Sequence, residues 1–279
     1  MAQFKRNRLS DSHASAALID VTTQNVEATG FFCCMSKRKT DGYQRKLRWL
    51  KDRFAEGMRI KMLKLPERGF IEYIPGEYAW RAVHTDGYLF IHCLWVVGRS
   101  KGKGFASTLL NTCIAEAKQS QRKGVVMVTS EKTWMPGRRI LDQHGFECVD
   151  TAPPTFSLMV RKLGKYPLPS FAGRWEEKAR ALGQGLTVIR SDQCPYIVDA
   201  TNIAIKTAAK AGIRSQVIEL KSRDDVLRLS PSPYGVFGLI CDGQILSYHY
   251  LLEKDLLPLL SSYEGAKLQT RKIIKGNQP

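Results

Sequence analysis

The segment Tyr88–Leu110 constrains the fold of this chain more than any other stretch. It reads YLFIHCLWVVGRSKGKGFASTLL: an apolar, β-rich run, a turn of Gly, Lys and Arg, and then a helical pattern. Such a strand–loop–helix unit can hold a phosphate, because loop N–H groups and the positive end of the helix dipole converge on the anion. Glycines let the loop backbone approach a ligand without a Cβ in the way. The sequence therefore predicts a phosphate-binding loop at Gly98–Ala106.

Two common phosphate-binding motifs do not fit this loop. The nucleotide-hydrolase loop requires Gly-x-x-x-x-Gly-Lys-Ser/Thr, and that string does not occur in the chain. The dinucleotide motif requires Gly-x-Gly-x-x-Gly, but after Gly102 and Gly104 the third glycine position is Ser107. Both nucleotide hydrolysis and dinucleotide binding are therefore disfavoured.

The loop instead resembles the acyl-coenzyme A loop of the GNAT superfamily of N-acetyltransferases. The family pattern is Arg/Gln-x-x-Gly-x-Gly/Ala, followed within a few residues by a Leu-Leu pair on the helix. Arg99–Gly104 matches literally, and Lys101–Ala106 matches with Lys in place of Arg. The second register is preferred, because it stands at the family's usual distance from Leu109 and Leu110.

Composition describes a soluble globular protein large enough for two domains. The chain has 279 residues, of which 43% are hydrophobic and 25% charged. Residues 1–16 are polar and basic, which predicts a flexible N-terminus and no secretory signal. Seven cysteines at unrelated spacings favour neither disulfides nor a metal site. These features predict a cytoplasmic protein with no membrane association and no metal.

The formal net charge of +17 raises the alternative of a basic nucleic-acid-binding module. However, residues 98–139 hold nine Lys/Arg against two Asp/Glu. A basic rim is expected around a coenzyme A loop, because the coenzyme carries a pyrophosphate and a ribose phosphate. No RNP, helix-turn-helix or zinc-finger motif occurs, so specific nucleic-acid binding is not expected.

The order of predicted elements in residues 17–163 also resembles a GNAT domain. It predicts an α+β fold with a mixed, mostly antiparallel sheet flanked by helices. The predicted strands are one that lies with its approaches in 17–36, then 59–65, 69–74, 78–84, 88–97, 125–129, one beginning at 147, and 155–161. The predicted helices are 42–56, 107–119 and 138–143.

A second pattern follows a Pro-, Gly- and charge-rich linker at 164–185. Residues 186–262 predict the order β-α-β-α-β-β-α, which resembles a small thioredoxin-like α/β domain, and 263–279 would be a C-terminal tail. In that resemblance, Pro233 occupies the place of the fold's cis-proline. The whole chain is similar to the YoaP-type family, a GNAT domain fused to a thioredoxin-like domain. The resemblance rests on the strings GFIEYIPGEYAWRAV, YLFIHCLWVVG, SDQCPYI and SPSPYGVF.

The resemblance implies an N-acetyltransferase that moves an acetyl group from acetyl-CoA to an amine by direct attack in a ternary complex. The acceptor would be a small-molecule or peptide amine, and a homodimer is among the expected partners. Two stretches would hold acetyl-CoA. The pantetheine arm would lie along Leu94, Trp95, Val96 and Val97. The phosphates would lie against Arg99, Lys101, Gly102, Lys103, Gly104, Phe105 and Ala106.

The general base is less clear from the sequence, because Phe90 occupies the position where many GNAT enzymes carry a glutamate. Regular alternation along the strand would place Phe90, His92 and Leu94 on one face. His92 is then the natural substitute as base, since imidazole titrates near neutral pH. The alternative is a hydrogen-bonded core histidine.

Two further residues complete the predicted catalytic set. Glu72 stands in an apolar strand, where it could act as base, orient His92 or form an ion pair with Arg81. Leu141 occupies the position of the tyrosine that many GNAT enzymes use as general acid. That role then falls to water, to another residue such as Tyr73, or to no general acid at all.

Cys194 is a possible reactive thiol. Cys-Pro-Tyr at a strand-to-helix junction resembles the glutaredoxin site, where the helix dipole stabilises a thiolate. Ile197 replaces the second cysteine, which excludes dithiol exchange within the motif. A thiol-redox or thiol-binding protein with a CoA-sensing GNAT half is one alternative, and an inert scaffold is the other.

Overall fold

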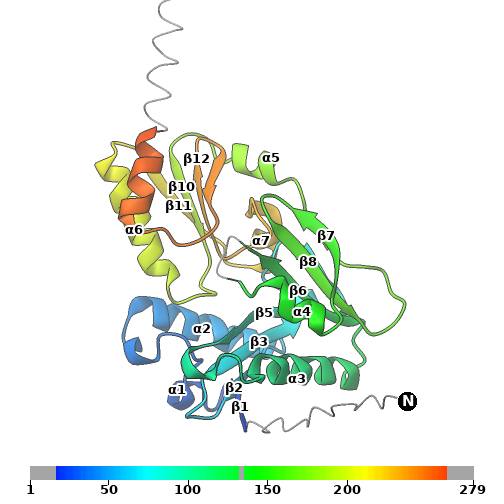
Figure 1. Ribbon diagram of the computed structural model, residues 1–279. Helices are drawn as coiled ribbons and strands as arrows, with labels where there is room; N and C mark the ends of the chain where they lie inside the picture. Colours follow the sequence, from blue (N-terminus) through cyan, green and yellow to red (C-terminus); the bar gives the residue numbers. More distant parts are fainter. Residues whose placement is uncertain (1–16, 132–134, 263–279) are drawn as a thin grey trace, which may run out of the picture.

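The computed structural model describes residues 17–131 and 135–262, so the predicted N-terminal segment 1–16 and tail 263–279 lie outside the described residues. A seven-stranded sheet in the order β1-β2-β3-β5-β6-β8-β7 forms the first half (Figure 1). All neighbours pair antiparallel except β5 and β6. The sheet is therefore mixed and mostly antiparallel, as predicted. Its strands are β1 (Leu18–Val21), β2 (Arg59–Leu63), β3 (Gly69–Pro75), β5 (Leu89–Val96), β6 (Gly124–Ser130), β7 (Glu147–Ala152) and β8 (Phe156–Lys162).

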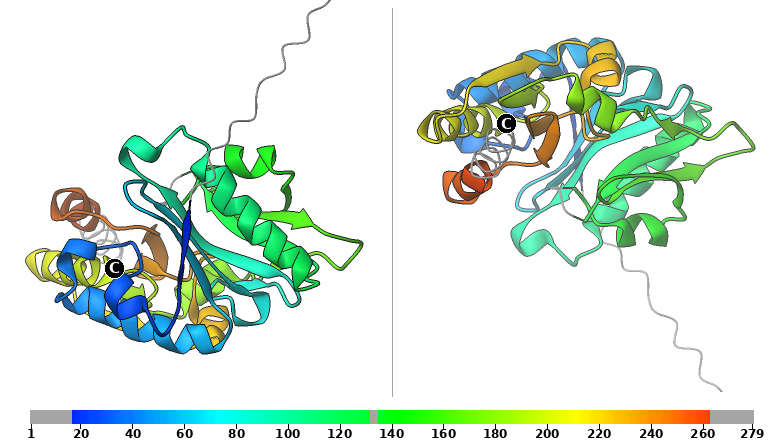
Figure 2. Two further views of the ribbon diagram at one scale, coloured as in Figure 1. Left: turned by 90° about the horizontal axis from the view of Figure 1, so that it is seen from below. Right: turned by 90° about the horizontal axis from the view of Figure 1, so that it is seen from above.

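Helices cover both faces of this sheet. Helix α3 lies on one face, and α2 lies on the other together with elements of the C-terminal half (Figure 2). The amphipathic pattern explains α2, because Tyr43, Leu47 and Leu50 recur on one side and are buried. The helices here are α1 (Val26–Thr29), α2 (Asp41–Ala55), α3 (Phe105–Gln119) and α4 (Arg138–Gln143), with 3₁₀ turns η1 (Met35–Lys37), η2 (Gly76–Tyr78) and η3 (Gly98–Ser100).

Two strand predictions were wrong in part. Residues 17–36, predicted as a strand with its approaches, are extended only at β1 and continue as α1 and η1. Residues 78–84 are extended only at β4 (Val83–His84), because the chain turns through η2 after Pro75. In both places, the hydrophobic residues that suggested a strand are buried from short helices and turns, and they have no regular period in the sequence.

Strands β5 and β6 separate part of the way along their length. They pair in parallel at Leu89–Ile91 with Val125–Met127, although β5 continues to Val96 and β6 to Ser130. Beyond Ile91, the edge of β5 that faces β6 therefore has no ladder partner among the described residues, whereas the other edge stays paired with β3. The sheet opens at this point, next to the loop that leads into α3.

A β-bulge at His92 changes which side chains of β5 face each layer. Tyr73 of β3 is paired with Ile91, whereas Glu72 is paired with Cys93, so His92 is the extra residue. The predicted common face of Phe90, His92 and Leu94 was therefore wrong. Phe90 packs in the α2-side core, whereas Leu94 packs in the α3-side core.

The C-terminal half contains a four-stranded sheet in the order β11-β10-β12-β13. β10 and β11 are parallel, and β12 is antiparallel to both β10 and β13. Pro233 precedes β12, but the Ser232–Pro233 peptide bond is not cis, which differs from the cis-proline that the resemblance implies. The elements are β10 (Leu186–Arg190), α6 (Ile197–Lys210), β11 (Ser215–Glu219), α7 (Arg223–Leu229), β12 (Phe237–Cys241), β13 (Gln244–Ser247) and a helix at 253–262.

One of the hydrophobic core clusters is shared by the two halves. Ile189 of β10 and Val226 of α7 belong to the same buried cluster as Phe90 and Val126 of the first sheet. The predicted linker at 164–185 contains β9 (Ser170–Phe171), which pairs with β4, and α5 (Trp175–Arg180). The segment thus has regular structure, and the domain boundaries stay a prediction.

Candidate active site

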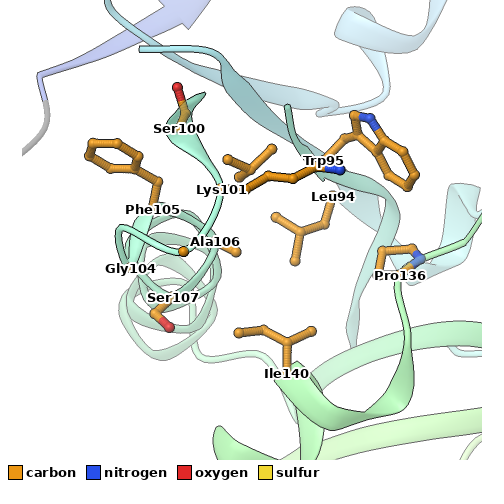
Figure 3. Close-up of a pocket in the computed structure, with 12 residues that line it drawn as sticks. Leu94, Trp95, Ser100, Lys101, Gly104, Phe105, Ala106, Ser107, Pro136 and Ile140 are labelled. Carbon is orange, nitrogen blue, oxygen red and sulfur yellow. The ribbon is translucent and has the colours of Figure 1, made fainter. Parts of the chain in front are cut away.

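A cavity of about 360 Å³ lies where the open end of β5 meets the start of α3 (Figure 3). Eight of the eleven residues predicted to hold the coenzyme line it; Val97, Arg99 and Lys103 do not. Pro136 and Ile140 lie across the cavity from the Gly104 turn (Figure 3). The complete lining is Leu94, Trp95, Val96, Ser100, Lys101, Gly102, Gly104, Phe105, Ala106, Ser107, Pro136 and Ile140.

The backbone of the loop presents hydrogen-bond donors to this cavity. Gly102 and Gly104 have φ of 77° and 82°, which L-residues rarely adopt, and a Cβ at either would meet no atom within 4 Å. Gly104 is the N-cap of α3 and supplies no capping side chain. Within the described chain, Phe105, Ala106 and Ser107 donate their N–H groups to no acceptor. A helix N-terminus with free donors at an open cavity can bind an anion.

Lysines add positive charge, and one of them is held by the neighbouring turn. Lys101 lines the cavity, whereas Lys103 Nζ donates to Glu67 Oε1 at 3.0 Å. Ser100 Oγ donates to Glu67 Oε2 at 2.6 Å and accepts from the Arg68 N–H at 2.8 Å. Glu67 therefore ties the loop to the β2–β3 turn, and Lys101 remains the lysine that faces the cavity.

The open edge of β5 contributes backbone groups to the other wall. Val97 donates its N–H to the Arg68 carbonyl at 3.0 Å, so its backbone faces β3. Backbone groups alternate between the two edges of a strand in an antiparallel ladder. Leu94 and Val96 therefore direct their N–H and C=O groups away from β3, to the edge that β6 leaves open. An extended ligand can pair with this edge.

Behind the cavity, three of the polar residues near the bulge form a buried cluster on the α2 side. Lys46 Nζ donates to both Glu72 oxygens, at 3.0 and 2.8 Å, and His92 Nδ1 lies 3.6 Å from Glu72 Oε1. The ion pair of Glu72 thus forms with Lys46 and not with Arg81, which the sequence had offered as a partner. His92 Nε2 accepts the Trp80 N–H at 3.0 Å, which leaves Nδ1 to carry the proton of a neutral ring.

Burial and the neighbouring charges shift both pKa values in this cluster. Burial alone would raise the pKa of Glu72, but Lys46 and His92 outweigh it and lower the pKa to about 2. Burial lowers the pKa of His92 to about 4, although Glu72 acts in the opposite direction. Glu72 is therefore ionised and His92 neutral at pH 7.

The other two predicted reactive groups lie away from the cavity lining. Tyr73 is fully buried on the opposite face from Glu72, in the core under α3, and burial raises the pKa of its hydroxyl. Cys194 is partly buried against α2, where a Cβ on Gly42 would lie 2.1 Å from the Pro195 carbonyl oxygen. Burial raises the pKa of the Cys194 thiol to about 11.

Sequence reasoning missed Lys46, although the sequence contains a signal for it. Lys46 lies on the same helical stripe as Tyr43, Leu47 and Leu50, so an amphipathic α2 must bury its ammonium group. A buried lysine requires a partner, and a carboxylate in an apolar strand requires one too. The two requirements could have been joined to predict the Lys46–Glu72 pair.

Comparison with known proteins identifies one close relative in sequence. The chain is 30% identical over 238 residues to the uncharacterized N-acetyltransferase YoaP of Bacillus subtilis (strain 168), covering 84% of this chain and 94% of YoaP. No protein-family model matches.

Solved structures that resemble this chain each cover just over half of it. One is a GNAT N-acetyltransferase (YhbS) from Escherichia coli in complex with CoA, with TM-score 0.38, 13% identity, and 56% of this chain and 89% of that chain covered. Another is Ard1 from Thermoplasma volcanium, with TM-score 0.39, 15% identity, and 54% and 99% covered.

Proposed function

The chain belongs to the N-acetyltransferase family represented by YoaP, and from this premise we propose that it moves an acetyl group from acetyl-CoA to an amine. One observation carries the proposal for this site. The free N–H groups that begin α3 and the unpaired edge of β5 meet in the same cavity. That arrangement suits a ligand with a phosphate at one end and an extended amide-containing arm at the other.

The coenzyme would lie from the loop towards the bulge. The N–H groups of Phe105, Ala106 and Ser107 would hold the pyrophosphate, with the Lys101 ammonium adding charge. The amide groups of the pantetheine arm would pair with the backbone of Leu94 and Val96, as an added strand pairs with a sheet edge. Arg99 and Lys103 stand outside the lining, so their proposed role is limited to attraction at a distance.

The transfer would proceed by direct attack in a ternary complex. The amine nitrogen forms a bond to the thioester carbonyl carbon, and an N–H on the open edge of β5 stabilises the resulting oxyanion. The carbon–sulfur bond then breaks, and the nitrogen's surplus proton ends on the departing thiolate. Acceptors with an accessible primary amine, either small molecules or peptides, fit this scheme.

His92 as general base stays a prediction, and its surroundings favour a different role. Its Nε2 lone pair is used by the Trp80 N–H, and its pKa of about 4 makes it a weak proton acceptor. We propose instead that His92 and Glu72 hold the bulge, and that the ammonium form of the acceptor loses one proton to water before the free amine attacks. Replacing a general base typically costs 10²–10⁴-fold. His92→Gln, which keeps an acceptor for Trp80, should therefore lower kcat by less than about tenfold.

A steeper fall in kcat, with loss of the acid limb of the pH profile, would restore His92 as the base.

Tyr73 as general acid also stays a prediction, and Tyr73→Phe tests it. Because its hydroxyl is buried under α3, away from the cavity lining, we expect no change in kcat.

The C-terminal half is proposed to be thioredoxin-like. The support is its sheet order β11-β10-β12-β13, with one parallel pair and a helix after β10 that follows Cys194. The thiol pKa of about 11 and the packing of Pro195 against α2 favour a scaffold over thiol exchange. Cys194→Ser should therefore retain acetyl transfer; loss of turnover would support a reactive thiol.

The cytoplasm is the proposed location. No helix within residues 17–131 and 135–262 is long and apolar enough to cross a membrane.

The direct test is coenzyme A release from acetyl-CoA in the presence of a panel of amines, followed by mass spectrometry so that no thiol reagent is needed. Wild type should acetylate at least one amine class. Lys101→Glu should lose most of this activity, whereas Lys210→Glu, which changes an exposed lysine on α6, should retain it. Equal activity in both variants would refute the assignment of the site.

A further inference from the structure

A buried arginine lies directly behind the bulge of β5. Arg81 Nη2 donates to the His92 carbonyl at 3.0 Å, and Nη1 donates to the Trp80 carbonyl at 2.9 Å. Arg81 is 5% exposed and forms no ion pair with a carboxylate of the described residues. A guanidinium without a counter-ion is costly to bury. The hydrogen bonds that Arg81 donates must therefore offset the cost of burying its charge.

The C-terminal half determines where the Arg81 guanidinium lies. Gln193 Oε1 accepts a second hydrogen bond from Nη1, and Gln193 Nε2 donates to Ser191 Oγ and to the Gly235 carbonyl, both at 2.9 Å. The Tyr234 ring lies 5.5 Å from the guanidinium carbon. Gln193 is itself buried, and its amide is fixed from both ends. The position of Gln193, and with it that of the Arg81 guanidinium, therefore depends on how the C-terminal half is docked.

The backbones of the two halves also approach closely here. Ala82 donates its N–H to the Pro233 carbonyl at 3.4 Å. A Cβ on Gly235 would lie 3.1 Å from the Trp80 carbonyl oxygen and 3.4 Å from the Arg81 Cα. The segment 233–235 is therefore packed along residues 80–82, and little movement of Arg81 is available while the halves are docked.

The bulge at His92 connects the contact between Arg81 and the C-terminal half to the part of β5 that lines the cavity. The extra residue of a bulge is left without a ladder partner, so other groups must fix it. For His92, Arg81 donates to the backbone carbonyl and the Trp80 N–H donates to ring Nε2. The position of the bulge also decides that Leu94 and Val96, rather than their neighbours, direct backbone groups to the open edge.

We infer that Arg81 and Gln193 are positioning residues for acetyl transfer. Gln193 holds Arg81, Arg81 holds the His92 bulge, and the bulge aligns the β5 edge that faces the thioester. The C-terminal half is thus a brace for the reaction strand. This inference rests on the proposed acetyl transfer, and neither residue belongs to the lining of the coenzyme cavity.

The test compares Arg81→Gln and Gln193→Leu with a matched control. A misplacement of about 1 Å can cost 10²-fold in rate, so both variants should lower kcat about 10- to 100-fold. KM for acetyl-CoA should stay within about twofold, because the phosphate loop is untouched. Gln193→Glu, which retains an acceptor for Arg81, should recover part of the loss. The control is Arg223→Gln, which removes a 3.3 Å ion pair between the two halves at Asp86, before the start of β5 and not at the His92 bulge, and should leave kcat unchanged.

A double variant and an exchange measurement complete the test. Arg81→Gln combined with Gln193→Leu should lose no more than the worse single variant, because the two act in one chain of contacts. Amide hydrogen exchange in residues 92–96 should speed up in both single variants but not in Arg223→Gln. This readout needs no acceptor, so it remains decisive if the wild type acetylates no amine and the proposed function fails. Unchanged exchange, or a rate loss equal to that of the control, would overturn the inference.

Discussion

Acid should destabilise this protein through His92, because the folded state keeps the ring neutral. The pKa of His92 is about 4 in the folded protein against 6.5 for an unperturbed histidine. Between these values the unfolded chain binds a proton that the folded protein does not, so stability falls as the pH falls. Each pH unit in this window corresponds to about 1.36 kcal/mol. Between pH 7 and pH 4.5, His92 should therefore remove roughly 2.5 kcal/mol of unfolding free energy.

The variant His92→Gln isolates this contribution. Glutamine retains an acceptor for the Trp80 N–H but cannot take up a proton. Urea denaturation followed by fluorescence at pH 7, 6, 5 and 4.5 gives the unfolding free energy of each protein. The difference between wild type and His92→Gln should shrink steadily towards low pH, by roughly 2.5 kcal/mol in total.

A surface histidine provides the control for this titration. His84→Gln, at an exposed position on β4, should follow the wild-type curve. Parallel curves for wild type and His92→Gln would refute the reasoning. They would mean that His92 is charged or accessible in the folded protein, and its role as a base would regain support.

Two further predictions concern the buried ion pair and the loop. Lys46→Met should lower the unfolding free energy by about 3–5 kcal/mol in chemical denaturation, because it leaves the Glu72 carboxylate buried without a partner. Lys46→Met with Glu72→Leu should regain most of that loss; no recovery would argue against a buried charge as the cause. Gly104→Val places a β-branched residue at φ 82° and should cost about 1–2 kcal/mol. It should also weaken acetyl-CoA binding, whereas Gly173→Val, at φ 68° with similarly open space, should cost stability alone.

Elements with strong local patterns were predictable from the sequence. The apolar run of β5, its glycine-rich turn and the helical period of α3 are adjacent in the chain, so their arrangement follows from local geometry. The predicted helix 138–143 and strand 186–190 coincide with α4 and β10 for the same reason. The coenzyme loop was therefore visible before any tertiary contact was known.

Features that depend on pairing between distant strands were not predictable. The bulge at His92 arises from the register between β3 and β5, and a single extra residue moved Leu94 to the face opposite Phe90. The Arg81–Gln193 contact joins residues 112 positions apart and has no periodic signature. The common face of Phe90, His92 and Leu94, which was inferred from simple alternation, was wrong for this reason, whereas the catalytic set of His92, Glu72 and Tyr73 stays a prediction.

Calorimetric titration with acetyl-CoA tests the central claim most directly, since it requires no knowledge of the acceptor. The free donors at the start of α3 and the Lys101 ammonium should give the wild type saturable binding with one molecule per chain. Lys101→Glu should weaken this binding by at least about tenfold, because it reverses a charge facing the pyrophosphate. Absence of binding by the folded wild type, or equal affinity in the variant, would contradict the account.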